Sequence, residues 1–314
     1  REAGSTAVQE LAFTLANALA YVDAAITKGM DIDVFAPRLS FFFNCHNDFF
    51  EEIAKFRAAR TLWHDLIEQR YQPKNPKSKM LRFHTQVAGV SLTAQQPLNN
   101  VARVTIQALA AVIGGTQSLH TNSYDEALGL PTESSATVAL RTQQIIAEES
   151  GVADTVDPIA GSWHVERLTK EIYERAHNII QQIEQKGGAM AAIEEGWQQQ
   201  EIHLAAYQHL NEIENDTRRI VGVNHGTMDE IEGIPVMKTD ASLGERQTER
   251  LAELRAQRDD QAVAEALEAV ALSAENGSNL FPYVIEAVRA RATLGEIINV
   301  LKARFGTYMA PSGF

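Results

Sequence analysis

The sequence is poor in the features that mark nucleic-acid-binding, membrane or disulfide-bonded proteins. Its 41 acidic residues outnumber its 28 basic ones, and the resulting net charge of −13 disfavours a general nucleic-acid surface. No apolar run approaches the roughly 18–20 residues of a membrane-spanning helix. Cys45 is the one cysteine, so no intrachain disulfide can form, and a reducing, cytoplasmic-type compartment fits best. Neither a Gly-x-Gly-x-x-Gly motif nor a Walker-type loop is present, which weakens nucleotide-binding interpretations.

The chain is long enough to bury a sizeable core. It has 314 residues, 45% of them hydrophobic, and this length predicts one or two domains. The first residue is Arg1 rather than Met, and apolar residues recur at helical spacing as early as residues 7–19. We therefore expect the sequence to be a segment of a longer protein.

Strand-like and helical stretches alternate through the first 122 residues. Three runs read as strands, residues 37–43, 81–87 and 116–121. Amphipathic helices lie between them, from about residue 48 to 71 and from about residue 97 to 114. This alternation is typical of a parallel α/β sheet, either doubly wound or closed as a (β/α)8 barrel. Because three strands cannot close an eight-stranded barrel, a barrel would need about five strands from outside this chain.

Each predicted strand carries polar side chains on one face. Parallel strands that are covered on both sides normally read as continuous apolar runs, and a buried polar group without a partner costs a few kcal/mol. We therefore expect water or a ligand to lie along this face. Its residues are Arg38, Ser40 and Phe42 in the first run, Arg82, His84 and Gln86 in the second, and Thr116, Ser118, His120 and Asn122 in the third.

A basic loop precedes the second predicted strand. Within nine residues it places four cations, at Lys74, Lys77, Lys79 and Arg82. The loop is either a solvated segment or a phosphate site, and its composition leaves both interpretations open.

After Pro131 the pattern becomes mainly helical. We interpret 220–223 as a short strand, 224–243 as irregular and 308–314 as the start of a linker. The predicted helices cover residues 133–150, 166–186, 189–195, 199–215 and most of 244–306.

Several long motifs resemble one enzyme family. They are FAPRLSFFF, PKNPKS, LRFHTQ, TQSLHTNSYDEALGLPT, EESGVADTVDP and the later VGVN. In this order they are similar to the catalytic chain of the methylmalonyl-CoA mutase family of acyl-CoA mutases, and the resemblance covers nearly the whole chain. It implies an α/β fold in which residues 1–132 form the last three strands of a (β/α)8 TIM barrel for the substrate. Residues 133–314 would form the helical region that follows and end in a linker.

The resemblance also implies a reaction. Family members use adenosylcobalamin to start a radical 1,2-rearrangement of an acyl-CoA carbon skeleton, and the protein binds, orients and shields the reacting groups. Methylmalonyl-CoA and succinyl-CoA would be the substrate pair. The stretch Phe43–Asp48 is more similar to isobutyryl-CoA or 2-hydroxyisobutyryl-CoA mutase large subunits, so such a paralogue is an alternative. A non-catalytic scaffold relative is another.

The motifs carry over particular residues. Gln86 and His84 would lie at the reaction centre between substrate and corrin. The implied substrate contacts are Arg38, Ser40, Phe42, Lys77 and Ser118. The implied cobalamin contacts are Gly89, Glu126 and Gly129, where a glycine would let the backbone approach a flat macrocycle.

Each assignment has a structural alternative. Arg38 could form an ion pair, since guanidinium suits carboxylate as well as phosphate. Glu126 could cap the turn that follows it. His120 is interpreted as a core histidine rather than a ligand. Cys45 and His46 lack further ligands at suitable spacing, so no metal site is expected.

Two family motifs are missing from the chain. The Tyr-His pair with the catalytic histidine would fall immediately before Arg1, and the Asp-x-His-x-x-Gly motif whose histidine ligates cobalt does not occur. The cobalt ligand would therefore come from a separate cobalamin-binding domain or small subunit. The expected partners are that subunit and an acyl-CoA, in a dimer or heterotetramer, with no nucleic acid and no membrane.

Overall fold

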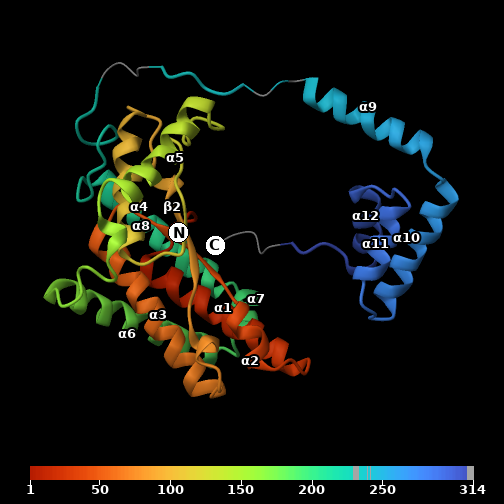
Figure 1. Cartoon of the computed structure of the whole chain (residues 1–314), viewed down its shortest axis with the longest axis horizontal. Coiled ribbons are helices and arrows are strands. Elements are labelled where there is room, and N and C mark those ends of the chain that lie inside the picture. The colour runs from red at the N-terminus through yellow and green to blue at the C-terminus, as the bar shows by residue number, and fades with distance from the viewer. Residues whose placement is uncertain (229–232, 239, 241, 310–314) are drawn as a thin grey trace. The chain divides into compact units, whose positions relative to one another are not determined.

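A computed structural model describes residues 1–228, 233–238, 240 and 242–309 (Figure 1). The described residues form two compact units that divide between Met237 and Lys238. No helix in these ranges has the length and apolar character that crossing a bilayer requires. The first unit contains strands β1 (Phe41–Cys45), β2 (Phe83–Val87) and β3 (Ser118–His120), and helices α1 (Ala7–Thr27), α2 (Ile32–Phe35), α3 (Phe49–Tyr71), α4 (Asn99–Ile113), α5 (Glu133–Glu148), α6 (Trp163–Gln185), α7 (Ala189–Glu194) and α8 (Trp197–Glu214).

The three strands form one parallel sheet in the order β1-β2-β3, which confirms that the predicted strand runs are neighbours. Helix α3 connects β1 to β2, and α4 connects β2 to β3. Asp48 starts α3 by accepting a hydrogen bond from the Glu51 N–H, as its N-cap position requires. The fold class is therefore α/β with parallel strands.

The predicted start of the first strand is wrong. Residues 36–38 form a short 3-10 turn, η1 (Ala36–Arg38), and β1 begins only at Phe41. Pro37 favours this turn because its ring fixes φ and removes a backbone donor. Arg38 and Ser40 consequently lie ahead of β1 rather than on it.

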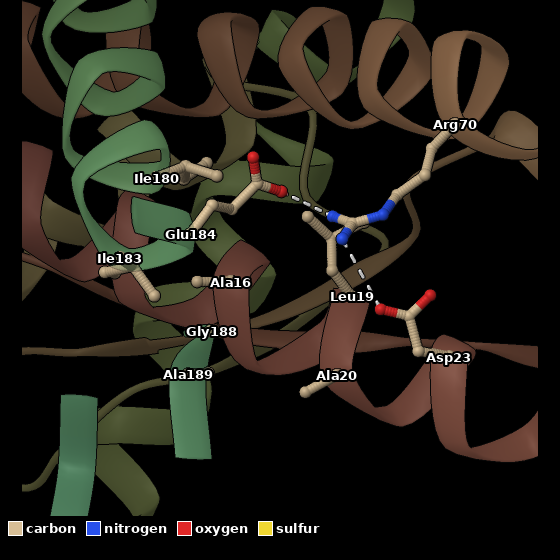
Figure 2. Close-up of a pocket in the computed structure, with 10 residues that line it drawn as sticks. All are labelled: Ala16, Leu19, Ala20, Asp23, Arg70, Ile180, Ile183, Glu184, Gly188 and Ala189. Atoms are coloured by element: carbon tan, nitrogen blue, oxygen red, sulfur yellow. Dashed lines mark hydrogen bonds and ion pairs between the residues drawn. The ribbon is translucent and has the colours of Figure 1, made fainter. Parts of the chain in front are cut away.

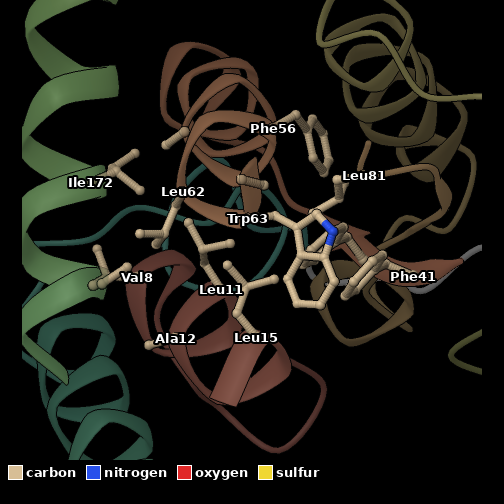
Figure 3. Packing of buried hydrophobic residues seen from close by; sticks show 14 of the residues in the cluster. Val8, Leu11, Ala12, Leu15, Phe41, Phe56, Leu62, Trp63, Leu81 and Ile172 are labelled. Atoms are coloured by element: carbon tan, nitrogen blue, oxygen red, sulfur yellow. The ribbon is translucent and has the colours of Figure 1, made fainter. Parts of the chain in front are cut away.

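One face of the sheet packs on a hydrophobic core in which aromatic rings take part (Figure 3). The Phe43 and Phe83 rings meet edge-on at 5.5 Å, and Phe83 stacks on Phe56 of α3 at 5.0 Å. Phe41 contacts Trp63 of α3 edge-on, with ring centroids 4.8 Å apart. Rings at such separations add attraction to the apolar area that they bury. The strands are thus anchored from one side, and their opposite face is left for polar residues.

Helices predicted after residue 132 are present with small shifts of their ends. Helix α6 begins at Trp163 and packs against α1 and α3. The predicted strand at 220–223 is wrong, because Val221 forms only an isolated bridge to His225. Gly222 has φ of 86° there, and the side chain of Asn224 accepts the Ile220 N–H at 2.7 Å. Part of the predicted irregular segment and residues 310–314 of the predicted linker lie outside the described residues.

An ion bridge joins three helices over a small cavity of about 50 Å³ (Figure 2). Arg70 of α3 contacts Glu184 of α6 at 2.5 Å and Asp23 of α1 at 3.5 Å. Ile180 and Leu19 line the space beside it. A cavity of this size holds at most a water or two, so its role is structural.

The second unit is a separate helical cluster. It contains α9 (Ser242–Gln257), α10 (Asp260–Glu275), α11 (Phe281–Arg289) and α12 (Leu294–Phe305), as the predicted helical character of 244–306 required. Its hydrophobic core cluster contains the buried residues Val263, Val270, Ala287, Ala292 and Ile297. Arg258 donates to both oxygens of Glu296 at 2.8 Å, and Glu296 completes a capping box with Thr293 at the start of α12.

We expect Glu296→Gln to lower the unfolding midpoint of the second unit. The guanidinium of Arg258, followed by hydrogen bonds from Thr293, lowers the pKa of Glu296 from its usual 4.5 to about 2. A lowered carboxyl pKa stabilises the fold above pH 4.5, and the contribution is lost as the pH falls toward 2. Urea unfolding at pH 7 and pH 3 should therefore show a parent–variant difference that shrinks at the lower pH.

Glu286→Gln is the matched control for this experiment. It removes the same charge from an exposed ion pair with Arg289 in the same unit, where little stabilisation is expected. Equal midpoints for the two variants at pH 7 would refute the assignment.

Candidate functional site

The polar face of the sheet gathers four of the predicted residues. Strand register aligns Phe42, His84 and Ser118 across the three strands, and Gln86 lies two residues further along β2. The Nδ1 atom of His84 is 2.7 Å from Ser118 Oγ, and the ring centroids of His84 and Phe42 are 5.2 Å apart. Phe42 is 56% exposed, so this face is an open surface in the chain as described. A ligand could lie along it.

The surroundings of His84 favour its neutral imidazole form. Partial burial lowers its pKa below the ordinary 6.5, and the nearby charge of His120 acts in the same direction. A neutral ring has one nitrogen that donates and one that accepts. With Nδ1 engaged by Ser118, the other ring nitrogen is available for a ligand. His120 is exposed beside it, so the interpretation of His120 as a core histidine is wrong.

Gln86 is fixed by Asn122, which is not among the site residues predicted from the sequence. Its Nε2 donates to Asn122 Oδ1 at 3.1 Å. Asn122 is 3% exposed, yet its Nδ2 has no hydrogen-bond partner among the described residues. A buried donor without a partner is costly unless a ligand or water satisfies it. The alternation of residues 116, 118, 120 and 122 was the available signal, since it placed Asn122 on the polar face.

Gly89 and Glu126 approach Asn122 at the carboxyl end of the strands. A Cβ atom built on Gly89 would lie 2.6 Å from Asn122 Nδ2 and 3.3 Å from Glu126 Oε1, so a side chain there would displace both groups. Burial raises the pKa of Glu126 above its usual value, and the charges of Glu2 and Asp125 add to the effect. The structure thus brings two of the three predicted cobalamin contacts together.

The loop that carries Glu126 and Gly129 is anchored by Asp125. Asp125 is fully buried, and its Oδ2 accepts the Thr132 N–H at 3.1 Å. Gly129 is exposed further along this loop, where a built Cβ would lie 3.0 Å from Val236 Cγ1. Gly129 therefore stands apart from the contact between Gly89 and Glu126.

At the opposite end of the strands, the carboxylate of Asp33 holds the basic loop in place through hydrogen bonds. Asp33 accepts the backbone N–H groups of Lys74 and Asn75 at 2.9 and 3.0 Å, and the Ser78 hydroxyl at 2.9 Å. These bonds, that of Asn75 first, lower the pKa of Asp33. The 3-10 turn of this loop, η2 (Pro76–Lys79), packs against η1, so Lys77 and Arg38 belong to neighbouring segments.

The cations at this end differ in what they contact. Lys79 pairs with Glu68 at 2.8 Å, and the Arg82 guanidinium donates to the carbonyl oxygens of Pro37 and Leu39. Arg38 and Lys77 are exposed, and within the described parts of the chain neither side chain has a polar partner. The ion-pair alternative for Arg38 therefore has no partner to support it there. Ser40 is exposed in the same region.

Comparison with known proteins gives a consistent answer. A sequence model of the family described as "Methylmalonyl-CoA mutase" matches residues 1–307. The chain belongs to the methylmalonyl-CoA mutase family. It is 46% identical over 309 residues to the 2-hydroxyisobutanoyl-CoA mutase large subunit of Aquincola tertiaricarbonis, covering 98% of this chain and 55% of that protein. It is 48% identical over 312 residues to methylmalonyl-CoA mutase of Escherichia coli (strain K12), covering 99% of this chain and 44% of that protein.

A mitochondrial relative is nearly as similar. Methylmalonyl-CoA mutase of Homo sapiens is 45% identical over 312 residues, covering 99% of this chain and 42% of that protein. The chain thus spans about half the length of the curated relatives it matches. Because the match covers only part of each relative, the activity of the whole protein is a matter for proposal.

Membership of this family implies a cobalamin cofactor, and the carboxyl end of the sheet fits one. Gly89 presents backbone without a side chain, Asn122 Nδ2 is a buried donor that finds no partner in the described part of the chain, and Glu126 adds a carboxyl beside them. A flat macrocycle with amide-bearing side chains could approach such a surface. Within the described ranges, no group of three or more His, Cys, Asp or Glu residues could hold a metal ion.

Proposed function

We propose that this chain is the later part of the catalytic chain of an adenosylcobalamin-dependent acyl-CoA mutase. The observation that carries the proposal is the order of the residues on the polar face, from the amino ends of the strands to their carboxyl ends. Arg38 and Lys77, whose side chains have no polar partner among the residues described, lie before β1 and β2. His84 and Gln86 lie along the strands, and Gly89 with Glu126 follows their carboxyl ends. A CoA ester laid along this face would have its phosphates at one end and its acyl group at the other.

The proposed fold follows from the same arrangement. Residues 1–132 would supply the last three strands of a (β/α)8 TIM barrel, and the polar face would line its axis. Residues 133–314 would form the helical region beyond the barrel. Catalytic sites of such barrels lie at the carboxyl ends of the strands, where Gln86 is followed by Gly89.

The chain's own residues would bind and orient the substrate. Arg38 and Lys77 would hold the CoA phosphates, with Ser40 beside them. Phe42 would cover the pantetheine arm, while Ser118 fixes the neutral His84 ring so that its free nitrogen faces the acyl group. Gln86, pinned by Asn122, would orient the thioester. Adenosylcobalamin, when bound at Gly89, Glu126 and Gly129, would supply the radical chemistry.

The acyl substrate has two candidates. A methylmalonyl-CoA/succinyl-CoA interconversion is favoured by several relatives that carry this name. A 2-hydroxyisobutyryl-CoA or isobutyryl-CoA rearrangement is favoured by the large-subunit relative and by the stretch Phe43–Asp48. We propose that the cobalt ligand comes from a separate domain or small subunit within a dimer or heterotetramer. A reducing, cytoplasmic-type compartment would suit its single buried thiol.

The decisive experiment reconstitutes the enzyme. The full-length protein should be assayed with adenosylcobalamin, with and without its cobalamin-binding partner, on methylmalonyl-, isobutyryl- and 2-hydroxyisobutyryl-CoA. We expect rearrangement of one of the three, and a histidine-ligated cobalt spectrum only when the partner is present. No rearrangement with any substrate would favour the scaffold alternative, and histidine ligation by this chain alone would refute the separate-ligand proposal.

A further inference from the structure

Four charged side chains are buried together beneath the end of β1. Lys55 and Glu52 of α3 are fully buried, whereas Glu10 of α1 and Arg1 have side chains only 8% exposed. Lys55 Nζ lies 2.5 Å from both Glu10 Oε2 and Glu52 Oε2, and Arg1 lies 2.6 Å from Glu52 Oε1. Two cations thus balance two anions, as buried charges require. None of the roles proposed above uses this group.

Two contacts lead from these charges to the backbone of Asn44. Glu10 Oε1 accepts the Asn44 N–H at 2.6 Å, and Lys55 Nζ donates to the Asn44 carbonyl oxygen at 2.6 Å. The same Glu10–Lys55 ion pair therefore occupies both hydrogen-bonding groups of one strand residue.

Those groups lie on the outer edge of β1. In a parallel strand, successive residues direct their backbone groups to opposite sides. The Phe41 N–H donates to Arg82 and the Cys45 carbonyl accepts from Ala88, so these odd-numbered residues bond toward β2. Asn44 consequently faces away from β2, where a further strand would normally pair.

Asn44 also belongs to the polar face. It is in register with Gln86, which is in register with His120, and its Nδ2 donates to Glu2 Oε1 at 3.0 Å. We propose that the Glu10–Lys55 ion pair has a positioning role. By occupying both backbone groups of Asn44, it prevents another strand from pairing with the outer edge of β1 there, and it fixes the position of β1 at the level of Gln86. A strand that continued the sheet on that side would pair with β1 only before Asn44. The catalytic part of this inference rests on the proposed function.

The chemistry of the carboxylates supplies a matched pair of variants. Each carboxylate uses its two oxygens for two different contacts. Glu10 accepts hydrogen bonds from the Asn44 N–H and from Lys55, whereas Glu52 accepts one from Arg1 and forms an ion pair with Lys55 through its other oxygen. Gln has only one oxygen, so Gln at either position breaks one contact. Glu10 joins Lys55 to the Asn44 N–H, whereas Glu52 joins Lys55 to Arg1. Glu10→Gln and Glu52→Gln therefore remove the same charge beside Lys55, but only Glu10→Gln alters a side chain that itself contacts Asn44.

The test uses the full-length assembled enzyme and two readouts. We expect Glu10→Gln to speed hydrogen exchange at the Asn44 amide at least about tenfold, as loss of its acceptor predicts. The kcat should fall about tenfold while the KM for acyl-CoA stays within about twofold, because the phosphate-binding end is untouched. Glu52→Gln should lower the urea midpoint to a similar extent and leave both exchange at Asn44 and kcat near the parent values.

Unchanged exchange at Asn44 in Glu10→Gln, or equal changes in both variants, would overturn the proposal. If the parent enzyme had no mutase activity, the proposed function would be refuted. The hydrogen-exchange result would still show whether Glu10 holds the Asn44 backbone. Should Glu10→Gln fail to fold, Glu10→Asp replaces it, since the shorter carboxylate keeps the charge but cannot reach both donors. The same two readouts then decide.

Discussion

Replacing Gln86 by Met in the assembled enzyme is expected to lower kcat about 100-fold, with the KM for acyl-CoA within about threefold of the parent. The proposed reaction needs a fixed hydrogen-bonding group at the acyl end of the substrate. Gln86 stands in the middle strand of the polar face, and its amide is held by Asn122 at 3.1 Å. Removing one preorganised donor from an active site commonly costs 10²- to 10³-fold in kcat, roughly. Steady-state kinetics on the active acyl-CoA would measure it.

Gln143→Met provides the control for this substitution. Gln143 of α5 also donates one hydrogen bond, to Thr121 Oγ1 at 2.9 Å, but it is not part of the polar face. Equal losses of kcat in the two variants would show that the effect comes from damage to the fold. A Gln86→Met enzyme with parental kcat would remove Gln86 from the reaction centre.

Much of the sheet could be predicted because its information is local. Alternation along residues 81–87 placed His84 and Gln86 on one face, and a helix between each pair of strands required parallel pairing. The alternating pattern predicts that Pro37 begins a strand, although the fixed φ of proline also suits the turn that the chain adopts. The prediction of a strand at 220–223 is wrong because Gly222 takes a left-handed conformation. The apolar residues around it give no sign of this conformation.

The parts of the site that could not be predicted depend on contacts between distant segments. Asn122 meets Gln86 across 36 positions of sequence, and this contact requires the register of β2 and β3. Glu10 and Lys55 are separated by 45 positions, and each lies on a helix whose pattern gives no reason to expect a buried charge. Composition likewise could not distinguish Lys77 from Lys79, which pairs with Glu68.

Because Lys79 is paired with Glu68 and Lys77 has no such partner among the described residues, we expect the two lysines to differ in their contribution to binding, and this leads to a second prediction with a large effect. Arg38→Ala and Lys77→Ala are each expected to weaken acyl-CoA binding about 10- to 100-fold in the complete enzyme. A charge-assisted hydrogen bond is worth roughly 1.5–3 kcal/mol, which corresponds to one to two decades in affinity. Arg38 offers a planar fork and Lys77 a point charge, and both suit phosphate oxygens. Calorimetry with a non-reactive acyl-CoA would measure the loss.

Lys79→Ala separates a specific contact from a general loss of positive charge. It lowers the net charge by the same amount in the same loop, but its ammonium group is already engaged by Glu68. We expect this variant to bind acyl-CoA within about twofold of the parent, because an exposed ion pair contributes little. An acyl-pantetheine analogue without the nucleotide portion should bind all three variants as it binds the parent. If Arg38→Ala and Lys77→Ala retain parental affinity for the complete CoA ester, both are solvated charges, and the direction assigned to the substrate along the sheet is wrong.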